Sequence, residues 1–210
     1  MDTDAPVTRV PVTFLALGDS YTIGEGVDPE ARWPVQLAAV LRTRGIAIAQ
    51  PQIIAKSGWS TDELLAAIDN AVAQGEVEPP YALVSLQIGV NNQYRGRSVD
   101  EYRAQFCVLL DLAIAFACGE PSRVLAVSIP DWGVTPYAQS AGRDRGQVAR
   151  EIDAFNAVAE AVCRSRGVRW VDVTDLSRHP DHCHWLVADG LHPSADMYRL
   201  WVERIDRALP

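Results

Sequence analysis

The strongest strand signal in the sequence is YALVSLQI, residues 81–88. It is short and apolar almost throughout. Such a run is typical of a strand that is covered on both faces, as strands are in a parallel sheet between two layers of helices. We therefore predict that residues 81–88 form a strand at the centre of a sheet.

Strand and helix patterns alternate outward from this stretch in both directions. The predicted strands span residues 10–17, 46–55, 81–88, 123–129 and 168–173, and the predicted helices span residues 30–44, 64–74, 98–118, 147–166 and 195–208. Because right-handed crossovers between parallel strands put helices on both faces of the sheet, this order predicts an α/β fold. We expect a three-layer αβα sandwich with a central parallel five-stranded sheet, of the flavodoxin-like type.

Local signals mark the ends of several elements. Ser60 with Glu63, and Ser98 with Glu101, form the capping-box pattern that starts a helix. Pro51 cannot donate a backbone hydrogen bond to a neighbouring strand. It therefore predicts that the second strand lies at an edge of the sheet or contains a bulge.

The composition is that of one globular unit. A chain of 210 residues, 48% of them hydrophobic, is long enough for one sizeable core. It stays below the roughly 250 to 300 residues at which cores divide, so we expect a single domain over residues 1–210. The net charge of −8 opposes binding to nucleic acid, which requires clustered Lys and Arg.

The N-terminus and the cysteines bear on the cellular compartment. The opening MDTDAPVTRVPV carries acids where a secretory leader carries Lys or Arg, and no stretch approaches the roughly 20 apolar residues of a membrane span. We expect a cytoplasmic protein with no membrane span. The cysteines are far apart and form no CxxC pair, which favours free thiols at Cys107, Cys118, Cys163 and Cys183.

Four short segments carry groups that are able to react. GDS (18–20) puts a hydroxyl at a strand-to-helix turn, and SGWS (57–60) offers a backbone N–H at a glycine. GVNN (89–92) presents carboxamides, and DGLH (189–192) places a carboxylate three residues before an imidazole. Each segment alone is also typical of an ordinary turn. Because ligands bind beyond the carboxyl ends of parallel strands, we expect the four segments to meet at that edge of the sheet.

Together the four segments supply a nucleophile, oxyanion donors, a base and an acid that orients the base. In this order the sequence resembles the SGNH (GDSL) hydrolases, whose blocks centre on a Ser in GDS, a Gly, an Asn in GxND and a DxxH. The resemblance spans residues 18–192 and implies the functional residues Ser20, Gly58, Asn91, Asp189 and His192. One departure is Asn92, which stands where the family usually has Asp. Any hydrogen bond or ion pair that the family's Asp carboxylate makes at this position is weakened or replaced in this chain.

The resemblance implies a serine esterase that needs no cofactor. Ser20 would attack an ester carbonyl, His192 would take and return the proton, and Asp189 would orient the imidazole. The backbone N–H groups of Ser20 and Gly58 and the side chain of Asn91 would form the oxyanion hole. We expect small soluble esters with a short acyl chain as substrates, with thioesters and lysophospholipids as the alternatives. The oligomeric state is not predicted.

Two aromatic residues and one long connection are candidates for substrate binding. Trp59 and Trp132 fall in or near the reactive loops, although core packing explains each of them equally well. Residues 130–146 form a connection that is long for an αβ fold, which makes it a candidate for substrate selection.

Other interpretations compete with an esterase. A non-catalytic flavodoxin-like or carbohydrate-binding module could use the same sheet, but the first loop, GDSYTIGEG, has two acids and no Lys, and a binding module leaves DGLH unexplained. The segment HPDHCHW contains possible metal ligands at His179, His182, Cys183 and His184. Their spacing is cramped and no second ligand pair lies elsewhere, so we predict no metal site.

Overall fold

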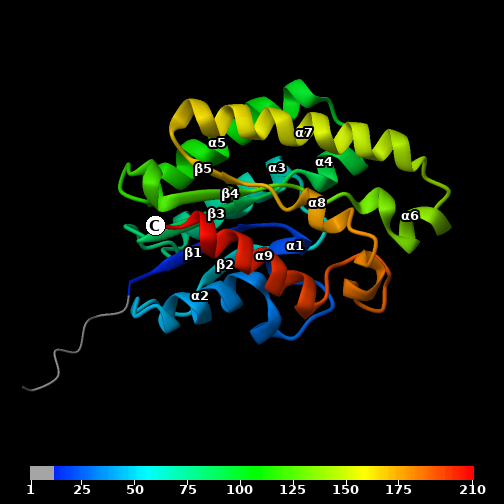
Figure 1. Cartoon of the computed structure of the whole chain (residues 1–210). Coiled ribbons are helices and arrows are strands. Elements are labelled where there is room, and N and C mark those ends of the chain that lie inside the picture. The colour runs from blue at the N-terminus through cyan, green and yellow to red at the C-terminus, as the bar shows by residue number, and fades with distance from the viewer. Residues whose placement is uncertain (1–11) are drawn as a thin grey trace, which may run out of the picture.

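A parallel five-stranded sheet forms the middle of the computed structural model, which describes residues 12–210 (Figure 1). Its strands are β1 (Phe14–Gly18), β2 (Gln52–Ala55), β3 (Leu83–Gln87), β4 (Val124–Val127) and β5 (Arg169–Val171), in the order β2-β1-β3-β4-β5. β3 pairs with both β1 and β4, so the stretch 81–88 supplies the central strand, as predicted. The strand order is that of flavodoxin-like sheets.

Helices cover both faces of the sheet (Figure 1). On one face α2 (Trp33–Thr43) packs against α9 (Ala195–Ala208), and on the other α5 (Val99–Phe116) contacts both α3 (Thr61–Ala73) and α7 (Arg145–Arg166). The predicted three-layer αβα sandwich is confirmed. Shorter helical turns fill the connections: α1 (Ser20–Ile23), η1 (Pro29–Ala31), α4 (Val90–Tyr94), η2 (Pro121–Arg123), η3 (Trp132–Val134), α6 (Pro136–Ser140), α8 (Thr174–Ser177) and η4 (His182–Trp185).

The N-terminal elements are shorter than predicted. The second strand was expected over residues 46–55, but only Ile48 forms an isolated bridge before Pro51, and β2 begins after that proline at the edge of the sheet. Proline lacks the N–H that a longer ladder needs. Residues 10–11 of the first predicted strand lie outside the described part of the chain, as does nearly all of the opening MDTDAPVTRVPV.

The later elements match the prediction more closely. The capping box at Ser60 is complete, and the backbone N–H of Ser60 donates to Glu63 Oε2 at 2.8 Å. At Ser98 only the N-cap half forms: the N–H of Glu101 donates to Ser98 Oγ at 3.1 Å, while the Glu101 carboxylate binds Arg97 and Gln105 instead. α7 begins two residues earlier than predicted because Asp144 caps it. The long connection 130–146 holds η3 and α6 rather than irregular chain.

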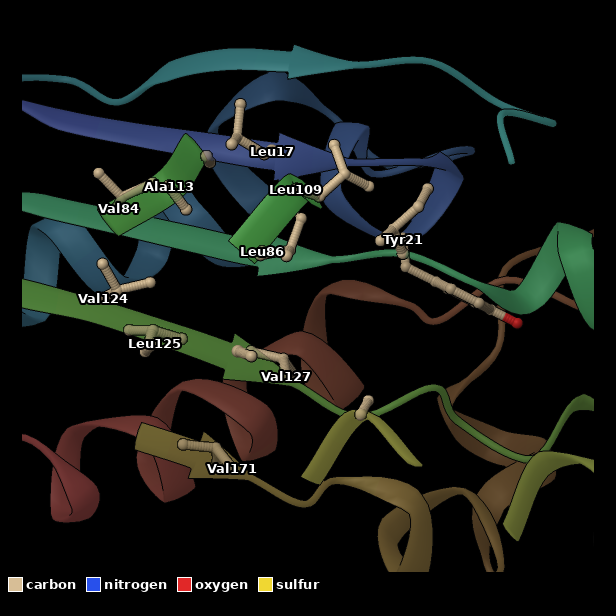
Figure 2. Close-up of a cluster of buried hydrophobic side chains, with 14 of the residues drawn as sticks. Leu17, Tyr21, Val84, Leu86, Leu109, Ala113, Val124, Leu125, Val127 and Val171 are labelled. Carbon is tan, nitrogen blue, oxygen red and sulfur yellow. The ribbon is translucent and has the colours of Figure 1, made fainter. Parts of the chain in front are cut away.

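The hydrophobic core lies between the sheet and the helices that pack against it. Figure 2 shows Leu17 of β1 and Val84 and Leu86 of β3 beside two residues of α5, Leu109 and Ala113, with buried side chains of β4 and β5 farther along the sheet. Leu17 of β1 and Leu86 of β3 are partners in the sheet register, and neither is exposed to solvent. This packing fixes the carboxyl ends of β1 and β3 relative to each other, and those ends carry the reactive segments.

Two further features concern the chain as a whole. Across residues 12–210, none of the helices has the length and apolar character needed to cross a membrane. The four cysteines all fall within the described residues and are free thiols, as predicted.

Candidate active site

A pocket of about 200 Å³ lies beyond the carboxyl ends of the strands and gathers residues from all four reactive segments. It is lined by Ser20, Tyr21, Ser57, Gly58, Val90, Asn91, Tyr94, Trp132, Tyr137, Leu191 and His192. The segments are far apart in sequence, so the fold alone brings them together. This is the meeting point that the topology of a parallel sheet predicts.

Ser20 is the first residue of α1, directly after β1. The preceding residue, Asp19, caps the helix by accepting the N–H of Tyr21 at 3.0 Å. β1 and β3 approach so closely at this turn that a Cβ on Gly18 would lie 2.5 Å from the carbonyl oxygen of Gln87. A glycine is therefore required for the tight passage from β1 to Ser20.

Asp19, which directly precedes Ser20, is almost completely buried. Its Oδ2 has no hydrogen-bond partner among residues 12–210. Burial raises the pKa of Asp19 to about 7, although the backbone N–H of Tyr21 acts in the opposite direction. Near neutral pH this carboxyl group is therefore partly protonated, which distinguishes it from the ionised Asp189.

His192 and Asp189 form a close pair. His192 Nδ1 lies 2.6 Å from Asp189 Oδ2, and Asp189 Oδ1 accepts the backbone N–H groups of Leu191 and His192 at 2.8 and 3.0 Å. Partial burial on its own would raise the pKa of Asp189, but the hydrogen bonds from His192 and Leu191 lower it below its usual value. An ionised Asp189 holds the proton on Nδ1, which leaves Nε2 of His192 free to act as a base.

The imidazole is held from one side by Tyr21, with 5.8 Å between the ring centroids. Ser20 and His192 line the same pocket, and these two described side chains share no direct hydrogen bond. In free enzymes this contact is often long and shortens only when substrate binds. The arrangement is compatible with a serine that is activated by histidine.

Gly58 lines the pocket from the loop between β2 and α3. It is the third residue of a turn that is closed by the N–H of Trp59, which donates to the carbonyl of Lys56 at 3.2 Å. Gly58 has φ +87°, a left-handed conformation that other residues adopt only with strain. The turn therefore selects glycine at the position that the family resemblance assigns to an oxyanion donor.

Asn91 reaches the pocket from α4, which follows β3. One N–H of its side-chain amide donates to the carbonyl oxygen of Trp59 at 2.9 Å. A carboxamide has two N–H donors, so the second remains free to bind a ligand oxygen. The next residue, Asn92, points elsewhere: it is fully buried and binds Thr61, the first residue of α3.

The two predicted substrate-binding tryptophans differ in position. Trp132 lines the pocket, is almost fully buried, and donates its indole N–H to Gln93 Oε1 at 2.7 Å. The side chain of Trp59 is half-buried against the core and does not line this pocket, and its carbonyl is the group that contacts Asn91. Of the two residues, only Trp132 is placed to touch a ligand there.

Several lining residues were not singled out from the sequence. Tyr94 and Tyr137 both line the pocket, and their hydroxyl oxygens lie 3.3 Å apart. The guanidinium of Arg143 lies over the rings of Tyr94 and Trp132, at 5.1 and 5.4 Å from their centroids. Tyr137 and Arg143 belong to the connection 130–146, whose length was the available signal. Tyr94 lies one helical turn beyond Val90, a spacing that places both on one side of α4.

The histidine and cysteine segment HPDHCHW lies outside the pocket. His182 contacts the carbonyl oxygens of His179 and Val134 at 2.8 and 3.0 Å, and Cys183 Sγ lies 3.3 Å from the same His182 ring. Within residues 12–210, no three His, Cys, Asp or Glu side chains are grouped to hold a metal ion. His182 instead links this segment to η3, next to Trp132.

The fold is similar to those of several solved structures. TesA has a TM-score of 0.72 at 22% identity, over 94% of this chain and 97% of that chain. A psychrotrophic esterase, EstA from Pseudoalteromonas sp., has a TM-score of 0.68 at 17% identity, over 93% and 95% of the two chains. A variant of Axe2, an acetyl xylan esterase from Geobacillus stearothermophilus, has a TM-score of 0.71 at 18% identity, over 94% of each chain.

No curated protein matches the sequence. Residues 16–200 match the GDSL-like Lipase/Acylhydrolase family, and this match covers most of the chain, including all four reactive segments. The match agrees with the resemblance that the four segments indicated. The chain therefore belongs to the GDSL-like lipase/acylhydrolase family and is a hydrolase of carboxylic esters.

Proposed function

We propose that this chain is a serine esterase that hydrolyses small soluble esters with a short acyl chain. Ser20 is the nucleophile, His192 the base, and Asp189 the acid that orients His192. The oxyanion hole consists of the backbone N–H groups of Ser20 and Gly58 and the side-chain amide of Asn91. The observation that carries the proposal is the pairing of His192 with Asp189 at 2.6 Å in a pocket that also contains the other three groups.

The reaction proceeds by acyl transfer through the serine. Ser20 Oγ attacks the ester carbonyl carbon while His192 Nε2 takes its proton, and the carbonyl oxygen becomes negatively charged between the oxyanion donors. His192 then returns the proton to the departing alcohol as the acyl–oxygen bond breaks. Water, deprotonated by the same imidazole, attacks the acyl enzyme, releases the carboxylic acid and regenerates Ser20.

The size and lining of the pocket favour a short acyl chain. Its volume of about 200 Å³ is below the roughly 300 to 1,000 Å³ of sites that enclose drug-sized ligands. Val90, Leu191 and the aromatic rings of Tyr94, Trp132 and Tyr137 give it apolar walls. Since the pocket must also receive the start of the alcohol, an acetyl or butyryl group leaves room for it, whereas an octanoyl group would take up most of the space. The acyl group of a thioester with the same short chain would contact the same walls.

The test compares wild type and Ser20→Ala on p-nitrophenyl acetate, butyrate and octanoate, with folding checked by circular dichroism. An acetyl thioester, followed through release of its thiol, is included to compare the two leaving groups. We expect wild type to hydrolyse the acetate and the butyrate faster than the octanoate, and Ser20→Ala to lose this activity. Equal rates in wild type and variant would refute Ser20 as the nucleophile, and a preference for octanoate would refute the short acyl chain.

A further inference from the structure

Arg95 follows α4 directly and crosses to the loop that carries Gly58. Its Nη2 donates to the carbonyl oxygen of Gly58 at 2.7 Å. Its Nη1 donates to Glu63 Oε2 at 2.8 Å and to Ser60 Oγ at 3.2 Å. One guanidinium thus joins the end of α4, the Gly58 turn and the first turn of α3.

The same turn receives a second hydrogen bond from α4. Asn91 Nδ2 donates to the carbonyl oxygen of Trp59, which is the peptide group next to that of Gly58. Because each peptide group is planar, holding two successive carbonyl oxygens fixes two successive planes of the backbone. Arg95 and Asn91 therefore restrain, from one short helix, the Gly58–Trp59 and Trp59–Ser60 peptides, which directly follow the peptide that carries the N–H of Gly58.

Gly58 needs such restraint because it has little of its own. A Cβ built at this position would meet nothing within 4 Å, so no neighbouring side chain confines the residue by packing. Glycine also has the greatest backbone freedom of any residue. The turn is otherwise held by the hydrogen bond between Trp59 and Lys56 and by a hydrogen bond from Ser57 to Glu25.

We propose that Arg95 is a positioning residue that fixes the Gly58 turn against α4, so that the N–H of Gly58 and the amide of Asn91 converge on one oxyanion. This inference rests on the proposed serine esterase function. An oxyanion hole lowers the barrier only if its donors are already in place when charge develops. A guanidinium suits the task because it can bind two acceptors at once in a fixed geometry.

Glu63 restrains Arg95 through the hydrogen bond that it accepts from Nη1. The backbone N–H of Ser60, followed by the Ser60 hydroxyl and Arg95, lowers the pKa of Glu63 despite the opposing effect of burial. Glu63 therefore stays ionised across the neutral range and keeps Arg95 directed toward the loop.

The chain provides a matched control two residues further on. Arg97 also binds the first turn of α3, through Asp62 at 2.6 Å, and it contacts Glu101 at 3.3 Å. Its hydrogen bonds do not include the Gly58 turn. Arg97→Ala therefore removes a comparable ion pair without touching the oxyanion donors.

The experiment measures kcat and KM on p-nitrophenyl acetate for wild type, Arg95→Ala, Arg95→Lys and Arg97→Ala, with thermal unfolding of each. Arg95→Ala should lower kcat about 10- to 100-fold with KM within about twofold, which is less than the loss of a donor itself. Added guanidinium ion should restore part of this activity, and Arg95→Lys should fall between wild type and Arg95→Ala. Arg97→Ala should stay within about twofold of wild type.

Two results would overturn the role of Arg95. One is an unchanged kcat in Arg95→Ala, and the other is an equal loss in Arg95→Ala and Arg97→Ala, which would indicate a general effect of the ion pairs on α3. If Arg95→Ala does not fold, Arg95→Lys is compared in its place. An unchanged kcat in Arg95→Lys, or a loss equal to that of Arg97→Ala, would then overturn the role of Arg95. Hydrolysis that survives in Ser20→Ala is a separate result, because it would remove the serine mechanism itself.

Discussion

Asn92 and Thr61 are joined by two hydrogen bonds. Asn92 Oδ1 accepts the backbone N–H of Thr61 at 3.0 Å, and Asn92 Nδ2 donates to Thr61 Oγ1 at 2.6 Å. Thr61 begins α3, so its N–H belongs to the first turn, where backbone donors have no partner within the helix. The amide of Asn92 keeps the acceptor that the family's usual Asp would offer and adds a donor.

Asn92→Asp should therefore be tolerated better than Asn92→Ala. A carboxylate can still accept the N–H of Thr61 and is favoured near a helix N-terminus, whereas alanine leaves that buried donor unpaired. We expect Asn92→Ala to lower the free energy of unfolding by about 1–3 kcal/mol in urea denaturation, and Asn92→Asp to lower it by less. An aspartate variant as unstable as the alanine variant would show that the donor to Thr61 Oγ1 is the essential contact.

Asp189→Asn should lower kcat by about 10²- to 10⁴-fold, because an amide can present its NH₂ to His192 Nδ1 and shift the ring proton to Nε2. The matched control is Asp181→Asn, since Asp181 lies 3.7 Å from His179 in a neighbouring loop outside the pocket. Steady-state kinetics on p-nitrophenyl acetate should show no change for the control. Similar losses in both variants would point to a general effect on these loops rather than to orientation of His192.

The sheet and the long helices could be predicted because their signals are local. The apolar run 81–88 and the capping boxes at Ser60 and Ser98 need no knowledge of distant contacts. Short helices such as α4 and α6 are different, since helices of this length are unstable alone and form only through tertiary contacts. Thr135 and Pro136 form a local start signal for α6, whereas α4 begins after Gly89 without a side-chain cap.

The reactive residues could be predicted for a similar reason. Each lies in a short segment beside a strand or helix end, and the topology gathers those ends. Arg95 binds partners that are distant in sequence, so nothing in its own surroundings marks it. Tyr94 and Tyr137 had only indirect signals, which were the spacing from Val90 and the length of the connection 130–146. Trp59 illustrates the converse: its place beside Gly58 suggested a ligand contact, but its side chain turns toward the core.

The buried Asp19 gives stability a defined pH dependence. Its pKa is raised to about 7 in the folded chain from an ordinary value of 3.8, so between these values the folded state binds more protons than the unfolded state. Stability must then fall as pH rises through this window. Asp19→Asn should remove the dependence while its side-chain oxygen still accepts the N–H of Tyr21.

Urea denaturation at pH 4, 5.5 and 7.5 measures the effect. The unfolding free energy of Asp19→Asn, relative to wild type at the same pH, should increase with pH by at most about 4 kcal/mol, as a shift of roughly three pKa units permits. Because both chains share every other titrating group, the difference isolates Asp19. A constant difference across the three pH values would mean that Asp19 is ionised in the folded chain like an ordinary carboxylate.

Tyr94 separates the pocket from a neighbouring hollow, since its side chain lines both. Tyr94→Ala should therefore extend the acyl site and raise the ratio of kcat/KM for octanoate over acetate by about tenfold, because each buried methylene is worth about 0.8 kcal/mol. Tyr94→Phe is the control: it keeps the ring and loses only the contact with the Tyr137 hydroxyl, so its ratio should stay within about twofold of wild type. If Tyr94→Phe changes the ratio as much as Tyr94→Ala does, the contact between the Tyr94 and Tyr137 hydroxyls determines the preferred acyl length. If neither variant changes the ratio, longer acyl chains extend out of the pocket on another side.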